Sequence, residues 1–551
     1  MIRRLCDSRT AAIIGAVHMA ASPSHSVVAR LTAASRAAAQ RTGTVPVEEA
    51  RLDSALAGAI DPRKLIDNLA EAWRIAPQDA LALLESHGFG ATLARLASAS
   101  AGETGGDEAT GPALTNADAM RLAGGKITIR AINPGFAEPV RAPQAAIDAV
   151  ARSTRAFLPT AAQDVLGVLY RDAPATYAAN WLKTDAPKIA AYVMKHFGDA
   201  GPRYLVNSGI GANEQFNYFV SALANARPDR RVTWLLANSP KEIADLPADA
   251  SIENTLFMEF SRSGITEETV KLHELTPRAA RRVVFANSGP LKALAERDGN
   301  LLLELPSEVS GRYGRNKTPI LMAPMFVAGL DVGAYWATVQ AACEAMQLAD
   351  PSGAPVVLAQ YIRLEQLRRG ANHLYLGTND ACLTRSADEF CQFWNEGVNR
   401  DGNDITMSRY LGLPRDSHMN LEAILGTSER KLAIFLLRTG AARGGKHPLL
   451  LDAADSLTAD HAGLTAQDVD LVLALANLKR CSEKMPTILI AVDEIDLAAS
   501  AWLGQLWADT TLVYSRIIGV DAGSNPEVKA VRTRAKEWLA DPKAARSLLG
   551  S

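Results

Sequence analysis

From Arg141 onward, short apolar runs alternate with longer segments that repeat apolar residues every three or four positions. The short runs have the length of buried strands, and the longer segments have helical periodicity. A first series of runs reads RYLVNSG, RVTWLLAN, NTLFMEF, RRVVFAN and LLLELP, and a second, from near Pro351, reads NHLYLGT, KLAIFLLRT, HPLLLDA and PTILIAV. Strands separated by helices predict parallel sheets with helices on both faces. We expect two doubly wound α/β sandwiches in tandem, over residues 141–350 and 351–520.

The chain before residue 141 has a different pattern. DPRKLIDNLAEAWRI and PQDALALLESHGFGATLARLA have helical spacing and begin with Asp or Pro-Gln-Asp start signals. Residues 98–112, SASAGETGGDEATGP, are rich in Gly, Ser and Thr and acidic, which is typical of an exposed linker. We expect a helical N-terminal region over residues 44–140 and assign no chemistry to it.

Residues 1–43 contain six arginines and one acid among many Ala and Ser residues. Organelle transit peptides share this composition. The alternatives are a disordered leader or a start placed too far upstream, with Met19 as the true start. We favour these alternatives because the alanine bias persists through the whole chain.

The bulk composition narrows the class of protein. The chain has 551 residues, 48% of them hydrophobic, which is enough for about three or four domains. Lys and Arg number 58 against 60 Asp and Glu, so the net charge of -2 gives no general attraction for nucleic acid or membrane surfaces. The five cysteines are scattered and show no C-x-x-C spacing, which argues against disulfides and structural zinc. With no long apolar run either, we expect a reduced cytoplasmic protein.

Two loops follow predicted strands, where ligands bind in open parallel sheets. In NSGIGANE, Gly209 and Gly211 allow the backbone to approach a ligand closely, and Asn213 opens a helix whose N-terminus favours an anion. The loop lacks the third glycine of the dinucleotide fingerprint and the Gly-Lys-Ser/Thr of a P-loop. A simple tight turn between strand and helix is an equally good interpretation.

The second loop, SRSGITEET, groups three hydroxyls within six residues. Ser261, Ser263 and Thr266 are spaced to donate to several oxygens of one phosphate, with Gly264 giving room. Plain capping of the next helix predicts much the same residues, and two glutamates follow that repel an anion. From these residues alone, both interpretations stay open.

The two loops together resemble the sugar isomerase (SIS) domain, and the order of the later motifs resembles the glucose-6-phosphate isomerase family, from about Leu205 to Arg532. SGRYG is similar to the family's Gly-Gly-Arg-Tyr/Phe-Ser segment, so Arg312 is the expected active-site arginine, a fixed cation beside a developing oxyanion. CQFWNEGVNRDG is similar to Gln-Leu-x-x-Glu-Ser-x-Gly-Lys and places Glu396 as the expected catalytic base.

Two further motifs complete the resemblance. LPRDSHMNLEAILG is similar to Gln-His-Ser/Ala-Phe, which implies that His418 opens the sugar ring and, as in the family, reaches the site of the other subunit. The segment LWADTTLVYSRIIGVDAGSNPEVKAVRTR is similar to the family's closing motif, with Arg532 at the position of a catalytic lysine. Arginine is a poor acid, so Lys529, one helical turn earlier, is the alternative. Residues 521–551 are expected to pack as helices near the active site.

Other positions depart from the family in the same direction. Asn213 stands where the family has a phosphate-loop serine, Arg262 replaces a lysine, and Gly397 replaces the serine after the base. These differences from the family affect the expected identity of the sugar more than the expected type of reaction.

The resemblance implies two flavodoxin-like SIS domains, a small phosphosugar ligand, a homodimer with shared active sites, and no metal or redox cofactor. The expected activity interconverts glucose 6-phosphate and fructose 6-phosphate through a cis-enediol. Arg262 and the hydroxyls and backbone of both loops hold the phosphate. The alternatives are an isomerase of another phosphosugar, a bifunctional fusion, and a sensor that binds a sugar phosphate without catalysis.

Overall fold

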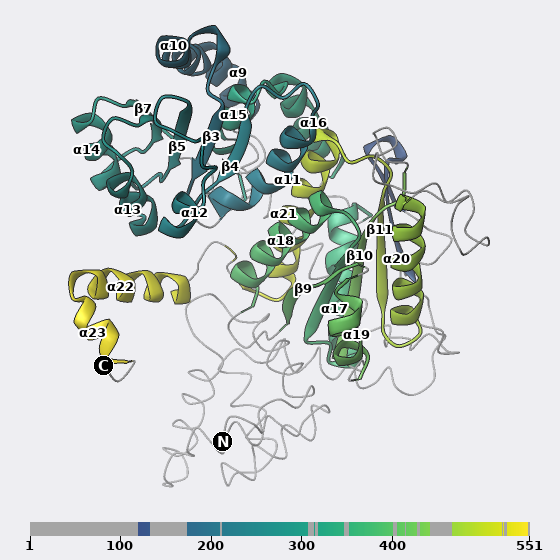
Figure 1. The fold of residues 1–551 in the computed structure, drawn as a ribbon. Coiled ribbons are helices and arrows are strands. Elements are labelled where there is room, and N and C mark those ends of the chain that lie inside the picture. Colours follow the sequence, from purple (N-terminus) through teal and green to yellow (C-terminus); the bar gives the residue numbers. More distant parts are fainter. Residues whose placement is uncertain are drawn as a thin grey trace, which may run out of the picture.

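The structure is a computed structural model. It describes residues 120–132, 174–209, 212–306, 313–314, 318–346, 352–399, 405–413, 415–426, 430–440, 466–520, 522 and 526–548. These residues form two sheets with helices on both faces, side by side in Figure 1, and confirm the predicted pair of α/β sandwiches.

The first sheet has five parallel strands in the order β4-β3-β5-β6-β7. The strands are β3 (Tyr204–Ser208), β4 (Thr233–Leu236), β5 (Thr255–Phe260), β6 (Arg281–Phe285) and β7 (Leu301–Leu303). Each of the five apolar runs of the first series forms one of them. The order reverses between β3 and β5, so the two predicted phosphate loops, which follow these strands, emerge side by side at the switch point.

Helices cover both faces of the first sheet. They are α9 (Pro174–Thr184), α10 (Ala186–Phe197), α11 (Ala212–Ala226), α12 (Pro240–Ala244), α13 (Glu267–Leu275), α14 (Gly289–Arg297), α15 (Pro319–Val327) and α16 (Val332–Ala345), with a 3-10 turn at Gly198–Ala200. Side chains of α12, α13 and α14 pack with Val206, Phe257 and Val284 on one face. The other face packs against α9, α10, α11 and α15. The apolar run ILMAPMFVAGLD lies largely within α15, as a buried helix.

The second sheet has six strands in the order β1-β2-β11-β10-β8-β9. They are β1 (Met120–Leu122), β2 (Ile127–Ile132), β8 (His373–Thr378), β9 (Thr406–Gly412), β10 (Lys431–Arg438) and β11 (Thr487–Val492). β8, β9, β10 and β11 are parallel. Three apolar runs of the second series form β8, β10 and β11, HPLLLDA lies outside the described residues, and β9 was not predicted.

Two strands of this sheet come from the region predicted to be helical. β1 and β2 pair antiparallel with each other around a short 3-10 turn (Ala123–Gly125), and β2 pairs antiparallel with β11. The sequence of β2, ITIRAI, buries alternate residues, as expected of a strand with one covered face. The end of the predicted helical region is therefore an edge ribbon of the second sheet; residues 44–98 lie outside the described part.

The second sheet is also covered on both faces. Its helices are α17 (Ala354–Arg369), α18 (Ala381–Gly397), α19 (Ser417–Leu425), α20 (Ala466–Ser482) and α21 (Leu497–Ile517), followed by α22 (Pro526–Ala540) and α23 (Pro542–Ser547). α17, α18 and α21 pack on the face that carries Ile434. α19 and α20 pack on the opposite face, which carries Phe435.

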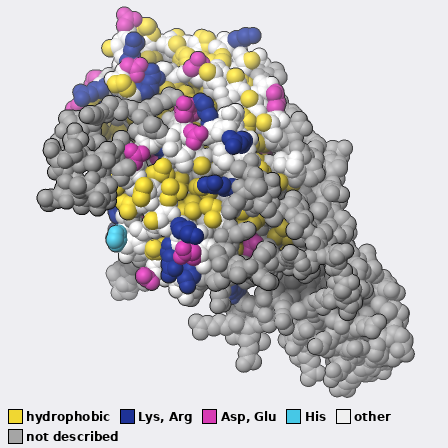
Figure 2. Space-filling view, turned by 90° about the vertical axis from the view of Figure 1, so that its right-hand side faces the viewer, with side chains coloured by type: hydrophobic (Ala, Val, Ile, Leu, Met, Phe, Trp, Pro, Cys, Tyr) yellow, Lys and Arg dark blue, Asp and Glu magenta, His cyan; other side chains and the backbone are white. Residues whose placement is uncertain are grey.

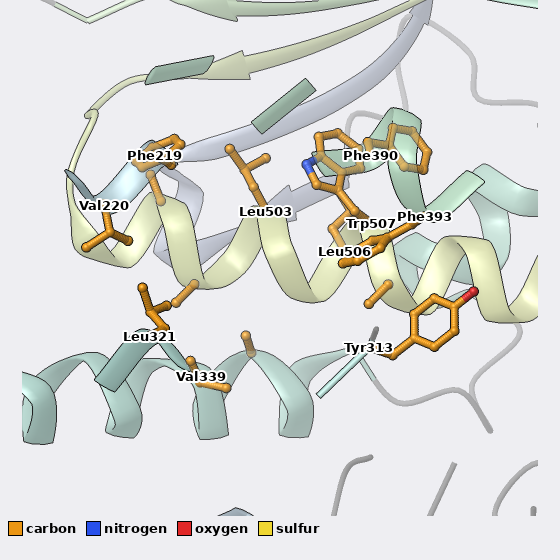
Figure 3. Packing of buried hydrophobic residues seen from close by; sticks show 14 of the residues in the cluster. Phe219, Val220, Tyr313, Leu321, Val339, Phe390, Phe393, Leu503, Leu506 and Trp507 are labelled. Carbon is orange, nitrogen blue, oxygen red and sulfur yellow. The ribbon is translucent and has the colours of Figure 1, made fainter. Parts of the chain in front are cut away.

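One core joins the two sandwiches. Nearly all side chains of α21 are buried, and α21 packs against α11 and α16 as well as α17 and α18. Figure 3 shows Leu503, Leu506 and Trp507 between residues of the first sandwich, such as Phe219 and Leu321, and residues of α18. Because this cluster is continuous, α18 lies between the two sandwiches. In the described part of the chain, no helix is both long and apolar enough to span a membrane.

Candidate functional site

The hydroxyl-rich turn closes on itself between β5 and α13. Ser261 is 2% exposed, its Oγ lies 2.8 Å from Oγ1 of Thr266, and the Thr266 N–H points at the same Oγ. Thr266 occupies the N-cap of α13, but its side chain makes no capping hydrogen bond. Arg262 and Ser263, between them, are exposed. The hydroxyls thus face each other rather than capping the helix, which favours the interpretation as an anion cradle.

The backbone of this turn is locked against the start of α14. Gly264 has φ of +63° and Gly289 has φ of +76°, conformations that favour glycine. A Cβ on Gly264 would lie 1.8 Å from the carbonyl oxygen of Ser288, so no larger residue fits without moving backbone. The Ser288 hydroxyl donates to the carbonyl of Ser263, and the Leu291 N–H donates to the carbonyl of Gly264. The turn is therefore fixed in shape before any ligand binds.

A buried ionic cluster lies beneath the turn. Nδ1 of His273 (α13) lies 2.5 Å from Glu259 (β5), and Nε2 lies 3.2 Å from Asp298, just after α14. Nε of Arg282 (β6) lies 3.2 Å from the other oxygen of Glu259. The hydrogen bond from Arg297, and then that from His273, hold the pKa of Asp298 well below its usual value. These contacts tie together the strand before the turn and both helices beside it.

The loop after β3 is only partly described. The N–H of Gly209 donates to Oδ1 of Asn238, which follows the neighbouring strand β4. Gly211 lies outside the described residues, and Asn213 is placed in the first turn of α11 without a described side chain. The shared anion site of this loop and the hydroxyl turn therefore stays a prediction.

Glu396 lies in the last turn of α18, the helix between the two sandwiches. Its Oε1 accepts a hydrogen bond of 2.9 Å from Nε2 of Gln392, one turn earlier. The end of α18 is fixed to β9, because Asn395 exchanges two hydrogen bonds with the backbone of Met407 and the Trp394 indole donates to the carbonyl of Ile405. Glu396 is half-buried, so its carboxylate is held by its own helix and remains reachable.

Three of the predicted catalytic segments converge next to Glu396. Tyr313 is fully buried, its ring packs on Phe393 of α18, and its hydroxyl donates to the carbonyl of Ala522. A Cβ on Gly397 would lie 2.5 Å from this hydroxyl and 3.0 Å from Cγ2 of Thr511. Residues flanking Arg312, Glu396 and the C-terminal helix are thus in contact, and we call Tyr313, Gly397 and Ala522 the junction.

The three other cationic residues of the predicted site have no described contact to this junction. Arg312 itself lies outside the described residues. Arg532 is exposed on α22, and the side chain of Lys529 on the same helix is not described. Figure 1 draws α22 and α23 apart from both sheets. Since α22 begins four residues after Ala522, its start lies within roughly 14 Å of the junction.

His418 is not brought to Glu396 within one chain. It is exposed at the start of α19, which covers the opposite face of the second sheet from α18. Glu396 precedes the first residue of β9 and His418 follows the last, so roughly 20 Å of strand separates the two ends. Within one chain His418 is therefore apart from Glu396, and its contribution to the site of a second subunit stays a prediction.

Sequence reasoning missed several residues of this site. Tyr313 stands inside the SGRYG motif, but only its packing shows its role. Glu259 and His273 were also missed, although a glutamate within the apolar run NTLFMEF signals a buried ionic partner. In the described residues, no group of three or more His, Cys, Asp or Glu side chains is placed to hold a metal ion.

Comparison with known proteins agrees with these features. No protein-family model matches the chain. The chain is 31% identical over 162 residues to the glucose-6-phosphate isomerase of Rubrobacter xylanophilus, covering 29% of this chain and 37% of that protein. It is 25% identical over 387 residues to the probable glucose-6-phosphate isomerase of Natronomonas pharaonis, covering 68% and 85%. The chain is thus a distant homologue of glucose-6-phosphate isomerases, at 25–31% identity.

Two solved structures share this fold. The glucose-6-phosphate isomerase of Chlamydia trachomatis superposes with a TM-score of 0.62 at 13% identity, over 82% of this chain and 96% of that chain. A hypothetical protein of Thermus thermophilus gives 0.57 at 21% identity, over 71% and 97%. The match to the probable isomerase of Halobacterium salinarum, at 28% identity, spans 51% of this chain and 66% of that relative. Two of the first three curated relatives are thus matched over less than two thirds of their length. The superpositions show that the fold is shared.

Proposed function

We propose that the protein interconverts glucose 6-phosphate and fructose 6-phosphate. The observation that carries this proposal is the junction, where residues next to Arg312, Glu396 and the C-terminal helix touch one another. A sensor that only binds a sugar phosphate has no need for a catalytic base, so contact between the segments that carry Arg312 and Glu396 supports catalysis over binding alone. The hydroxyl turn supports the phosphate half of the proposal.

In the proposed reaction, the hydroxyls of Ser261, Ser263 and Thr266 hold the phosphate, with Arg262 and the backbone from Gly209 to Asn213. Binding energy at this remote group positions C1 and C2 of the sugar. His418 from a second copy of the chain opens the ring, together with Arg532 or Lys529.

The proton transfer follows ring opening. Glu396 takes the proton from C2 of the open-chain aldose and returns it to C1, while a hydroxyl proton passes from O2 to O1. The aldehyde becomes a ketone with no net gain or loss of protons or electrons. Arg312 stabilises the negative charge of the enediolate between the two steps.

Substitution of the base tests the proposal. We expect Glu396→Gln to lower kcat by about 10²- to 10⁴-fold with little change in KM, because the amide cannot accept the proton. A coupled assay with fructose 6-phosphate measures this. Glu344→Gln is the matched control, since Glu344 accepts from Gln340 on α16 with the same four-residue spacing and is exposed. An unchanged kcat in Glu396→Gln would remove Glu396 from the reaction.

A non-catalytic sensor is the second candidate, favoured by Arg532 in place of the family lysine. It predicts saturable binding of glucose 6-phosphate with no turnover by the wild-type protein. Turnover in deuterium oxide separates the candidates further, because the enediol route incorporates deuterium at C2.

A further inference from the structure

The four elements around the hydroxyl turn each supply one member of the buried ionic cluster. Glu259 lies on β5 before the turn, His273 lies on α13 after it, Arg282 lies on β6, and Asp298 caps the end of α14. The side chains of all four are 2% exposed or less. Figure 1 shows α13 and α14 beside each other in the first sandwich. The charges of the cluster therefore lie in the frame that holds the turn.

Packing alone does not account for these charges. Moving a charged group out of water is costly, and a buried ion pair is often no more stabilising than apolar side chains of similar volume. The rest of this face of the sheet is apolar, as at Phe257 and Val284. Apolar residues could therefore pack at the four positions as well, so the charges point to a role in the neighbouring turn.

His273 supplies the charge that balances the cluster. Its Nδ1 lies 2.5 Å from a carboxylate oxygen of Glu259, and its Nε2 lies 3.2 Å from one of Asp298. An ionised carboxylate accepts hydrogen bonds but does not donate them, so both ring nitrogens carry a proton and the imidazole is a cation. Arg282, whose Nε lies 3.2 Å from Glu259, is the second buried cation. The positive charges of His273 and Arg282 thus cancel the negative charges of the two carboxylates.

Attraction for a phosphate dianion must come from charges close to the turn. The net charge of the chain is -2, and on the face that Figure 2 shows, Lys and Arg side chains lie among Asp and Glu side chains. Arg278 and Arg297 contact Asp298 at 2.8 and 2.7 Å, but both side chains are more than half exposed, so water screens their charge. A buried charge is screened much less, so one charge within the cluster has a larger effect on the turn.

We propose that His273 is a positioning residue whose positive charge sets the affinity of the hydroxyl turn for a phosphate dianion. Glu259 stands two residues before Ser261, about 7 Å along the strand. With His273 charged, the cluster is neutral and does not repel the ligand. Without that charge, one net negative charge remains beneath the turn and opposes the dianion. The proposal rests on the proposed function, because it takes the turn as the phosphate site.

Changing the charges within the cluster tests this role. We expect His273→Gln to raise the Kd for glucose 6-phosphate about tenfold or more, measured by calorimetry at low ionic strength. Adding Glu259→Gln should return the Kd to within about threefold of the wild type, since Arg282 and Asp298 then balance each other. A purely structural role predicts the opposite, because the double variant lacks both ends of a buried contact. An unchanged Kd in His273→Gln, or a double variant that binds no better than the single one, would overturn the proposal.

Two single substitutions separate the effect of charge from that of fold stability. His196→Gln is the matched control and should keep the wild-type Kd, because His196 lies on α10 of the same sandwich and packs against Tyr192, with ring centroids 4.4 Å apart. Asp298→Asn covers the case in which His273→Gln fails to fold. It makes the cluster more positive, so the Kd should fall, whereas a loosened turn would raise it. A Kd of Asp298→Asn at or above the wild-type value would overturn the proposal.

Turnover by the wild type separates this proposal from the proposed function. A wild type that binds glucose 6-phosphate without converting it would overturn the isomerase activity and leave the comparison of Kd values valid. A wild type that converts it, with an unchanged Kd in His273→Gln, would overturn only the role of His273. A wild type that does not bind glucose 6-phosphate would overturn both.

Discussion

At the scale of single residues, Ser261 and Thr266 separate two functions that their sequence leaves open. A capping threonine bonds to the N–H groups of its own helix, whereas Thr266 instead contacts the buried hydroxyl of Ser261. The two hydroxyls are held together by a turn that cannot relax, because Gly264 and Gly289 touch across it. Preorganised donors of this kind bind an anion with a small free-energy cost of reorganisation.

We expect Ser261→Ala to raise KM for a hexose 6-phosphate about tenfold and to leave kcat nearly unchanged. The change removes one proposed phosphate donor and the hydroxyl that contacts Thr266, and a tenfold change corresponds to about 1.4 kcal/mol. Steady-state kinetics measure both constants. Ser221→Ala is the control, because Ser221 is a buried hydroxyl that donates within α11, away from the turn. Equal effects of the two changes would contradict a role for Ser261 in binding.

At the scale of elements, the sequence predicts strands whose apolar runs are continuous and misses those that rely on distant partners. β9, TMSRYLG, contains Ser408 and Arg409, and Arg409 is tolerated because it pairs with Asp388 of α18 at 2.7 Å. β2 finds its partner β11 only in the folded chain. The hydroxyl turn could be predicted because its residues are neighbours in the sequence. The junction and the ionic cluster could not, because their residues meet only in the folded chain.

The close contact between Gly397 of α18 and Tyr313 can be tested by substitution. We expect Gly397→Ala to lower kcat by about tenfold or more, because the new Cβ would lie 2.5 Å from the Tyr313 hydroxyl and would displace the segment that carries Arg312. Steady-state kinetics with fructose 6-phosphate measure it.

Removing the clashing hydroxyl supplies the control. The double variant Gly397→Ala with Tyr313→Phe should recover most of the lost activity, while Tyr313→Phe alone loses the hydrogen bond to Ala522 and keeps the ring packed on Phe393. A double variant no better than Gly397→Ala would show that the space beside Tyr313 is not what glycine provides.

At the scale of the whole molecule, the shared core makes the two sandwiches one structural unit. The Trp507 ring stacks on Phe390 with centroids 4.3 Å apart, and its indole N–H donates to Ser386. In the same cluster, α21 also contacts residues of the first sandwich (Figure 3). The proposed site, with its phosphate loops on one sandwich and its base on the other, requires this rigid connection, because small displacements would change the distance between them.

We expect Trp507→Ala to destabilise both sandwiches together, by about 3–5 kcal/mol. Hydrogen exchange in urea, read on peptides from β5 and β10, should show the same loss of protection in the two sheets. Trp538→Ala on α22 is the control and should change neither. Loss of protection in the second sheet alone would show two independent units.

The pairing of β2 with β11 also has a consequence for synthesis. Roughly 360 residues separate the two strands, so at about 5–20 residues per second a ribosome makes β11 some 20–70 seconds after β2. During this interval the nascent chain carries an apolar ribbon whose permanent neighbour does not yet exist. Exposed strand edges of this kind can pair with other chains, so aggregation of the nascent protein competes with folding until β11 is translated.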